Sequence, residues 1–161
     1  MIVVNLSEYS AGKRRLRLGL VGGGTGLIGA IHANGARLSN RWEVVAGALS
    51  SNPKTAKSAG QQWHFDLDRC YLDYAKMAKA EAARPDGIDA VAIVTPNHLH
   101  APVALEFMRQ GIDIICDKPV TARLEEVDEL TAEQKKSGVF FGVTYAYASH
   151  PMIRQAREMV L

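Results

Sequence analysis

The segment from Gly22 to Gly29 contains five glycines in a spacing typical of a phosphate-binding loop. Gly24, Gly26 and Gly29 form the pattern Gly-x-Gly-x-x-Gly. In such a loop the first glycine permits a tight turn, the second lets the backbone approach a pyrophosphate, and the third lets a helix pack closely on a strand. The free amides that open the helix favour an anion. We therefore predict a dinucleotide-binding loop with contacts from Gly22, Gly24, Thr25, Gly26, Leu27, Ile28 and Gly29.

The glycine pattern has other interpretations. Gly22 could serve as the first glycine of a shifted register, and a glycine-rich turn can also be purely structural. A nucleoside-triphosphate loop is excluded because no Gly-Lys-Ser/Thr follows. The dinucleotide interpretation is favoured because the glycines follow an apolar run and open a segment of helical spacing within one strand–helix–strand unit.

A second polar segment, Ser50 to Lys54, follows the next apolar run. Dinucleotide folds usually place a carboxylate here to bind the adenosine ribose hydroxyls, and this segment has none. The hydroxyls of Ser50 and Ser51, the Asn52 amide and a lysine would instead accept a ribose 2′-phosphate, which favours NADP over NAD. Asn52 followed by Pro53 is equally typical of a turn and a helix cap, and the two interpretations are compatible.

Polar residues also follow two later apolar runs. The run at 90–94 leads into Thr95-Pro96-Asn97-His98-Leu99-His100, and the run at 112–116 leads into Asp117-Lys118-Pro119. Ligands of parallel sheets bind beyond the carboxyl ends of strands. A lysine there could polarise or protonate a substrate oxygen. Taken alone, Lys118 is better interpreted as a surface lysine in a turn. A helix cap would explain Asn97 but not the two histidines.

These segments need a scaffold of alternating strands and helices. The strands are apolar throughout, as in parallel sheets that are buried on both faces. The spacing of Leu27, Ile31 and Leu38 predicts one apolar face on the first helix. We therefore expect an α/β fold of the Rossmann type, a doubly wound and mostly parallel sheet. Its expected strands are 16–21, 42–49, 90–94, 112–116 and 139–143, and its expected helices 26–39, 53–60, 73–84, 98–110 and 124–137.

Composition narrows the function classes. The chain has 161 residues, 47% of them hydrophobic and 22% charged, which suits one globular domain. A formal charge of +2 gives no reason to expect nucleic acid or a membrane surface as partner. No cysteine and histidine spacing predicts a metal site. Two cysteines, and no secretory signal pattern at the start, favour a reducing cytoplasm.

The domain organisation has three parts. Residues 1–14 lack periodicity and are expected to form a flexible leader, and residues 15–148 are expected to form the dinucleotide-binding domain. Residues 149–161 begin a helix that stops in mid-pattern. We expect this helix to be the first of a second domain that the chain does not contain.

The order and spacing of these motifs resemble the Gfo/Idh/MocA oxidoreductase family, whose members include glucose-fructose oxidoreductase and inositol 2-dehydrogenase. The resemblance rests on Gly24 to Gly29 followed by His32, then on Thr95 to His100, and then on Asp117-Lys118-Pro119 in place of the family's Glu-Lys-Pro. It covers nearly the whole chain from Leu16. It implies a Rossmann domain followed by an α/β domain that covers the substrate and usually mediates homo-oligomerisation.

The resemblance also implies roles for single residues. Lys118 would be catalytic and contact both the nicotinamide and a substrate hydroxyl, and Pro119 would shape its loop through a cis bond. Asp117 would help to orient the cofactor. The nicotinamide pocket would be lined by Thr95, Pro96, Asn97 and His100.

Three departures from the family pattern qualify this picture. Ser50 replaces the acidic residue after the second strand, and no arginine precedes Pro151 in the segment from Tyr145. The family's catalytic histidine and its accompanying aspartate belong to the second domain. The implied function is the cofactor half of an NAD(P)-dependent oxidoreductase acting on a secondary alcohol or ketone of a sugar, polyol or cyclitol, with the fragment itself inactive. A non-catalytic NAD(P)-binding sensor or a free-standing nucleotide-binding domain are the alternatives.

Overall fold

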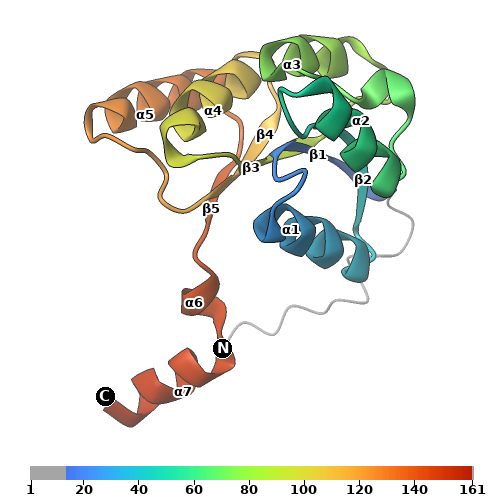
Figure 1. Ribbon diagram of the computed structural model, residues 1–161. Helices are drawn as coiled ribbons and strands as arrows, with labels where there is room; N and C mark the ends of the chain where they lie inside the picture. The colour runs from blue at the N-terminus through green and yellow to red at the C-terminus, as the bar shows by residue number, and fades with distance from the viewer. Residues whose placement is uncertain (1–13, 161) are drawn as a thin grey trace.

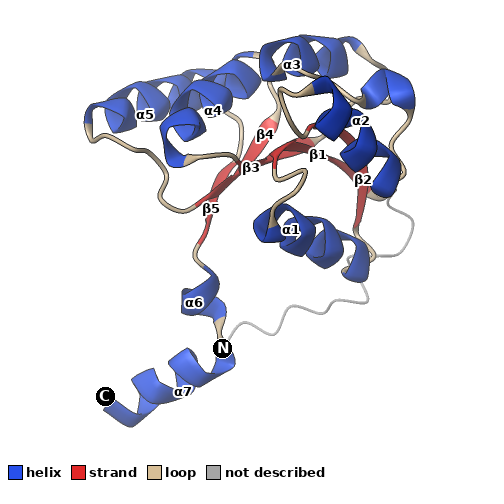
Figure 2. Ribbon diagram, viewed as in Figure 1, coloured by secondary structure: helices blue, strands red, loops and turns tan. Residues whose placement is uncertain are grey.

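A five-stranded parallel sheet with strand order β2-β1-β3-β4-β5 forms the centre of the molecule (Figure 2). The computed structural model describes residues 14–160. This architecture confirms the expected Rossmann-type α/β fold. The strands are β1 Leu16–Gly22, β2 Trp42–Ala48, β3 Ala90–Val94, β4 Asp113–Asp117 and β5 Phe141–Thr144.

Helices cover the two faces of the sheet unequally (Figure 1). The large residues of β3, Val91 and Ile93, pack under α3, α4 and α5, whereas Ala90 and Ala92 face α1. The connection from β1 to β2 runs through α1, and the later connections cross to the opposite face, as right-handed crossovers from this strand order require. The helices are α1 Leu27–Leu38, α2 Pro53–Gln62, α3 Tyr74–Ala83, α4 His100–Arg109, α5 Glu125–Ser137, α6 Ala146–Ser149 and α7 Pro151–Val160, with short 3₁₀ turns η1 Leu67–Arg69 and η2 Asn97–Leu99.

The face that α1 presents to the sheet differs from the face expected from its large apolar residues. Leu27 and Leu38 are 75% and 86% exposed, and Ile31 is also exposed. The buried residues of α1 are Gly29, Ala33 and Ala36. Small side chains let the helix backbone approach the sheet closely, and this leaves the larger residues on its outer side.

The ends of the elements shift by a few residues from those expected. Gly111 and Gly138 end α4 and α5 with φ of +74° and +71°, as expected for glycines that close helices. The helix expected over 98–110 is divided into η2 and α4, so Leu99, and not Asn97, is the residue that precedes α4. The last strand begins at Phe141 rather than at residue 139.

The segments that flank the sheet differ in their packing. Of the expected leader, residues 1–13 lie outside the described part, and Arg14 donates to both carboxylate oxygens of Asp89 at 2.7 and 2.5 Å. This ion pair lowers the pKa of Asp89. At the other end, α6 and α7 extend away from the sheet, and α7 has no buried residue (Figure 1).

Residues 14–160 contain neither a membrane-spanning helix nor a cluster of metal-binding side chains. No helix there is long and apolar enough to span a bilayer. No group of His, Cys, Asp and Glu side chains in those residues could hold a metal ion. Cys70 and Cys116 are both free thiols.

Candidate functional site

Three loops converge at the carboxyl ends of adjacent strands. The glycine loop follows β1, the Thr95 loop follows β3, and the Lys118 loop follows β4. The parallel register pairs Gly22 with Val94 and Ile93 with Cys116, so these strands end at the same edge of the sheet. This edge is where open α/β sheets bind their ligands.

The tight turn of the glycine loop falls earlier than the motif suggested. Gly22 and Gly23 have φ of +82° and +73°, a region that non-glycine residues rarely adopt. Gly24 was expected to make this turn, but its φ is not positive, and its amide instead donates to the Leu49 carbonyl at 3.3 Å. The shifted register, in which Gly22 is the first glycine, therefore describes the turn better. The turn begins at Gly22, two residues before the position that the motif starting at Gly24 predicts.

The other two motif glycines have distinct surroundings. A Cβ at Gly29 would lie 2.4 Å from the Gly23 carbonyl oxygen, so this glycine allows α1 to pack against the loop, as expected for the third glycine. A Cβ at Gly26 would meet only the Gly23 Cα at 3.9 Å. The space beside Gly26 is therefore open, directly before the unpaired first amides of α1.

The segment after β2 forms the cap of α2. The Asn52 side chain accepts hydrogen bonds from the amides of Lys54 and Thr55 at 3.0 and 3.2 Å, which confirms the expected helix cap. The Ser50 hydroxyl accepts from the Asn52 amide at 3.1 Å. Ser51 and Lys54 are exposed and remain available to a ligand beside the glycine loop.

Removal of this cap has a small expected effect. Asn52→Ala leaves two amides of α2 without their side-chain acceptor, so we expect it to lower the free energy of unfolding by about 1 kcal/mol. Urea unfolding followed by far-ultraviolet circular dichroism measures this change. Asn52→Asp is the matched control, since its carboxylate can accept the same bonds. Equal losses in both variants would contradict the capping role.

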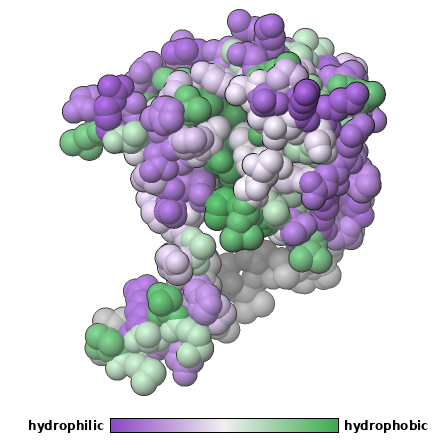
Figure 3. All heavy atoms as spheres, viewed as in Figure 1, coloured by the Kyte–Doolittle hydropathy of each residue, from purple (hydrophilic) through white to green (hydrophobic). Residues whose placement is uncertain are grey.

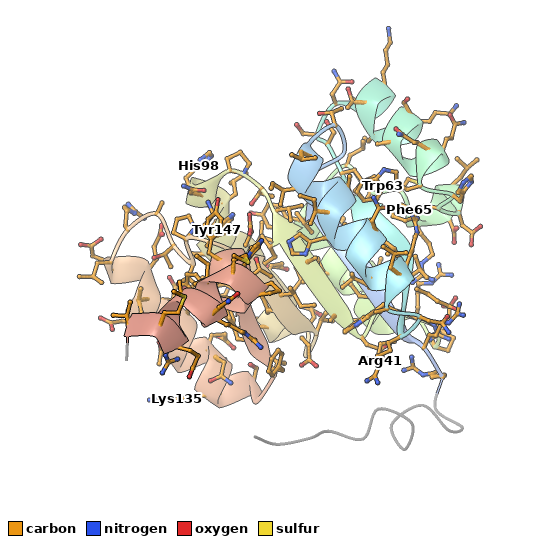
Figure 4. All side chains as sticks on the ribbon, turned by 90° about the horizontal axis from the view of Figure 1, so that it is seen from below. Arg41, Trp63, Phe65, His98, Lys135 and Tyr147 are labelled. Carbon is orange, nitrogen blue, oxygen red and sulfur yellow. The ribbon has the colours of Figure 1, made fainter. Side chains whose placement is uncertain are left out.

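The Thr95 loop contains a buried hydroxyl with no partner. Within residues 14–160, Thr95 Oγ1 is the buried side-chain nitrogen or oxygen atom that lacks a hydrogen bond. Such groups are uncommon because an unpaired buried hydroxyl costs free energy. Pro96 and Asn97 are exposed, and His98 points outward from η2 (Figure 4). Thr95 is thus the residue of this loop whose buried hydroxyl has an unused hydrogen-bonding capacity.

His100 differs from the other residues of its motif. It was expected to line the nicotinamide pocket, but its side chain is only 1% exposed. The ring lies 2.6 Å from the Pro119 carbonyl oxygen through Nδ1 and 3.0 Å from the Thr95 carbonyl oxygen through Nε2. Because it begins α4 beneath both loops, His100 contacts their backbones rather than an open cleft.

The Lys118 loop is held next to β5. Thr144 Oγ1 donates to Asp117 Oδ1 at 2.7 Å, and the Lys118–Pro119 peptide bond is cis, as the family resemblance implied. Lys118 and Pro119 are exposed. The backbone of this loop is therefore ordered by its neighbours while the ammonium group of Lys118 remains free to meet a ligand.

An apolar groove of about 820 Å³ continues from the Lys118 loop between α1 and α6. Green surface gathers beside α1 where this helix faces α6 (Figure 3). Burial lowers the pKa of His32 on the groove wall, although the nearby Asp117 charge acts in the opposite direction. The groove is lined by Leu18, Ile28, Ile31, His32, Gly35, Ala36, Ser39, Trp42, Ile115, Asp117, Lys118, Thr144, Tyr145, Ala146, Tyr147 and Ala148.

The structure therefore adds residues that sequence reasoning did not assign to the site. Thr144 is the last residue of β5, Tyr145 and Tyr147 follow it, and all three line the groove beside Lys118. The sequence did offer a signal for these residues, since Tyr145 and Tyr147 come shortly after the strand expected over 139–143. Ser50, Ser51 and Asn52 lie at the end of β2 and do not line this groove.

The fold and the convergent loops define a dinucleotide-binding type of Rossmann domain. A sequence model described as "Oxidoreductase family, NAD-binding Rossmann fold" matches residues 16–145. The chain belongs to this family, Gfo/Idh/MocA.

Several proteins resemble the chain over most of its length. It is 35% identical over 147 residues to the uncharacterized oxidoreductase YfiI of Bacillus subtilis, covering 90% of the chain and 37% of that protein. An oxidoreductase structure from Sinorhizobium meliloti shares 48% identity with a TM-score of 0.85, and the match covers 92% of the chain and 41% of that structure. An inositol dehydrogenase homolog from Azotobacter vinelandii, solved with NADH and myo-inositol, shares 38% identity with a TM-score of 0.83. This match covers 91% of the chain and 39% of that structure. The chain thus spans about two fifths of the length of these relatives.

Proposed function

We propose that the chain binds NAD(P) across the glycine loop and serves as the cofactor half of an oxidoreductase. The substrate would be a secondary alcohol, or the corresponding ketone, of a sugar, polyol or cyclitol. The observation that carries the proposal is the open space at Gly26 on the same sheet edge as the unpartnered Thr95 hydroxyl. The space would accept a pyrophosphate, and the hydroxyl would gain a hydrogen-bond partner.

The residues present fit such a cofactor. The first amides of α1 would donate to the pyrophosphate, and Thr95 Oγ1 would bind the nicotinamide end, with Pro96 and Asn97 at the rim of the same loop. Ser51 and Lys54 lie on the α2 side, where the ribose would lie. Because no carboxylate occupies Ser50 to Lys54, a ribose 2′-phosphate would not be repelled, which supports NADP over NAD.

Lys118 would act on the substrate. The bound nicotinamide supplies the acceptor or donor of the hydride. The Lys118 ammonium would donate a hydrogen bond to the reacting oxygen, which stabilises the alkoxide that develops when the alcohol loses its proton. Asp117, held by Thr144 at 2.7 Å, would orient the loop that presents Lys118.

A further part of the parent protein would complete the site. The groove wall exposes Ile28, Ile31 and Tyr147, and α7 exposes Met152 and Val160. Exposed apolar surface of this kind usually packs against another element. We propose that a substrate domain covers the groove in a longer parent chain, with residues 149–161 as its first segment, and that this domain supplies the proton-transfer residue.

Titration with NADPH and, separately, NADH tests the cofactor proposal. Trp42 and Trp63 are native probes, because nicotinamide binding quenches tryptophan emission. We expect saturable binding of both, with NADPH tighter. Tighter binding of NADH than of NADPH would contradict the preference for NADP inferred from Ser50 to Lys54, whereas the proposed oxidoreductase function would stand. No binding by the folded chain would contradict the proposal that this chain forms a dinucleotide site by itself.

Gly26→Val makes this test specific to the glycine loop. The Cβ of the new side chain would meet only the Gly23 Cα, at an ordinary contact distance of 3.9 Å, and Gly26 has an extended backbone that valine tolerates. We expect unchanged thermal stability and a loss of NADPH affinity of at least about a hundredfold, since the pyrophosphate could no longer reach the helix amides. Gly35→Ala is the matched control on α1. Full NADPH binding by Gly26→Val would place the cofactor elsewhere.

A further inference from the structure

The buried imidazole of His100 lies between the two loops that follow β3 and β4. Its Nδ1 is 2.6 Å from the carbonyl oxygen of Pro119, and its Nε2 is 3.0 Å from the carbonyl oxygen of Thr95. A carbonyl oxygen can only accept a hydrogen bond. Both contacts are therefore hydrogen bonds only when both ring nitrogens carry a proton.

The two loops lie beyond the end of their shared ladder. The register between β3 and β4 ends at the pair Ile93 and Cys116, whereas Thr95 and Pro119 lie two and three residues further along. His100 joins their backbones at this point. On the other side of Lys118, Asp117 is held by Thr144. Lys118 thus stands between two residues whose positions are set by side chains from α4 and β5.

We infer that His100 is a positioning residue that donates from both ring nitrogens and so fixes the Thr95 and Lys118 loops relative to each other. A neutral ring would turn a lone pair toward one carbonyl oxygen, and that contact would become repulsive. The contact with the Thr95 carbonyl oxygen also holds the backbone that carries the unpartnered Thr95 hydroxyl. The role in cofactor binding rests on the proposed function, whereas the bridge itself does not.

Nitrogen NMR of the unaltered chain tests the bridge directly. A ¹⁵N-labelled sample at neutral pH reports the protonation of each imidazole nitrogen, and the chain has five histidines. His100→Gln assigns the signals by their disappearance. We expect one histidine with protons on both nitrogens that exchange slowly with water. A His100 ring with one unprotonated nitrogen would overturn the inference, because such a ring binds only one loop.

NADPH binding tests the consequence of the bridge. A glutamine has one amide donor group on a flexible stem, so His100→Gln should release at least one loop and weaken NADPH binding roughly tenfold. Met108→Ala is the control, since Met108 is fully buried on the same helix, near its other end. It should lower the melting temperature while NADPH affinity stays unchanged. Equal affinity losses in both variants would reduce His100 to a packing residue and contradict the inference.

The two proposals fail in distinguishable ways. If the unaltered chain does not bind NADPH, the proposed function is contradicted, and the imidazole spectrum still decides whether His100 bridges the loops. If NADPH binds and the ring carries a single proton, the function stands and the bridge is wrong.

Discussion

Gly29→Ala is expected to lower the melting temperature by roughly 6–12 °C and to abolish dinucleotide binding. A Cβ at this position would lie 2.4 Å from the Gly23 carbonyl oxygen and 2.8 Å from its Cα. Both contacts are with backbone, which cannot rotate away as a side chain can. The start of α1 would therefore move from the loop, at a cost of about 3 kcal/mol, and its amides would leave the proposed phosphate position.

Gly35→Ala controls for the general effect of adding a methyl group to α1. A Cβ there has no atom within 4 Å, and the residue lies in the same helix. Alanine is the better helix former, so we expect this variant to gain up to about 1 kcal/mol. Differential scanning calorimetry and NADPH titration compare the two variants. If Gly29→Ala melts like the unaltered chain, the close contact between α1 and the loop does not exist in solution.

Glu81→Gln is expected to destabilise the chain by about 3–5 kcal/mol, the second large effect. Arg69 and Glu81 form a bidentate pair in which Arg69 Nε lies 3.1 Å from Glu81 Oε1, and both residues are buried. The Tyr71 hydroxyl also donates to Glu81 at 2.9 Å, and burial and this carboxylate raise the pKa of Tyr71 to about 12. Neutralising Glu81 leaves the buried guanidinium of Arg69 with only the half-exposed carboxylate of Asp86, 3.6 Å from Nη1, as its counter-charge.

An exposed pair provides the control for the charge change itself. Glu129 lies 3.5 Å from Arg109 on the surface of α5, with both side chains about half exposed. Glu129→Gln should cost less than about 1 kcal/mol because water screens the pair. Guanidinium unfolding of both variants gives the comparison. The double variant Arg69→Met with Glu81→Leu should recover most of the loss, since it removes both buried charges. Equal effects of Glu81→Gln and Glu129→Gln would contradict the role of burial.

The buried ion pair and the proposed cofactor site lie in different parts of the fold, so substitutions in one should not affect the other. The Arg69–Glu81 pair joins η1 to α3, whereas the glycine loop and Lys118 lie at the carboxyl ends of the strands. Glu81→Gln should therefore lower stability without changing NADPH affinity while the chain stays folded. Gly26→Val is expected to lower NADPH affinity without changing stability.

Local patterns in the sequence determined the strands of the sheet and the helices that connect them, with their ends placed to within a few residues. Continuous apolar runs such as 90–94 predicted buried parallel strands, because a strand covered on both faces needs apolar residues at every position. Asn52 and Gly138 marked helix ends through bonds and backbone angles that involve only neighbouring residues. The three loops could also be assigned to one edge of the sheet. Each of them directly follows a strand, and parallel strands all end at the same edge.

Tertiary packing decided which side of each element faces the core and what each site residue contacts. In α1 the spacing of Leu27, Ile31 and Leu38 was helical, but Ala33 and Ala36 are buried because close approach to the sheet has room only for small side chains. Glu81 belongs to a helix rich in Ala and Lys, and its buried partner Arg69 lies in another element, so only the tertiary structure shows this pair.

His100 shows most clearly what only the three-dimensional structure provides. Its motif suggested a ligand-facing side chain, whereas its ring binds the backbone of Pro119, which is 19 residues away in the sequence. The proximity of these two residues depends on the pairing of β3 with β4 and on the path of α4. The sequence therefore determined which residues gather at the sheet edge, and packing between distant segments decided which of them are free to meet a ligand.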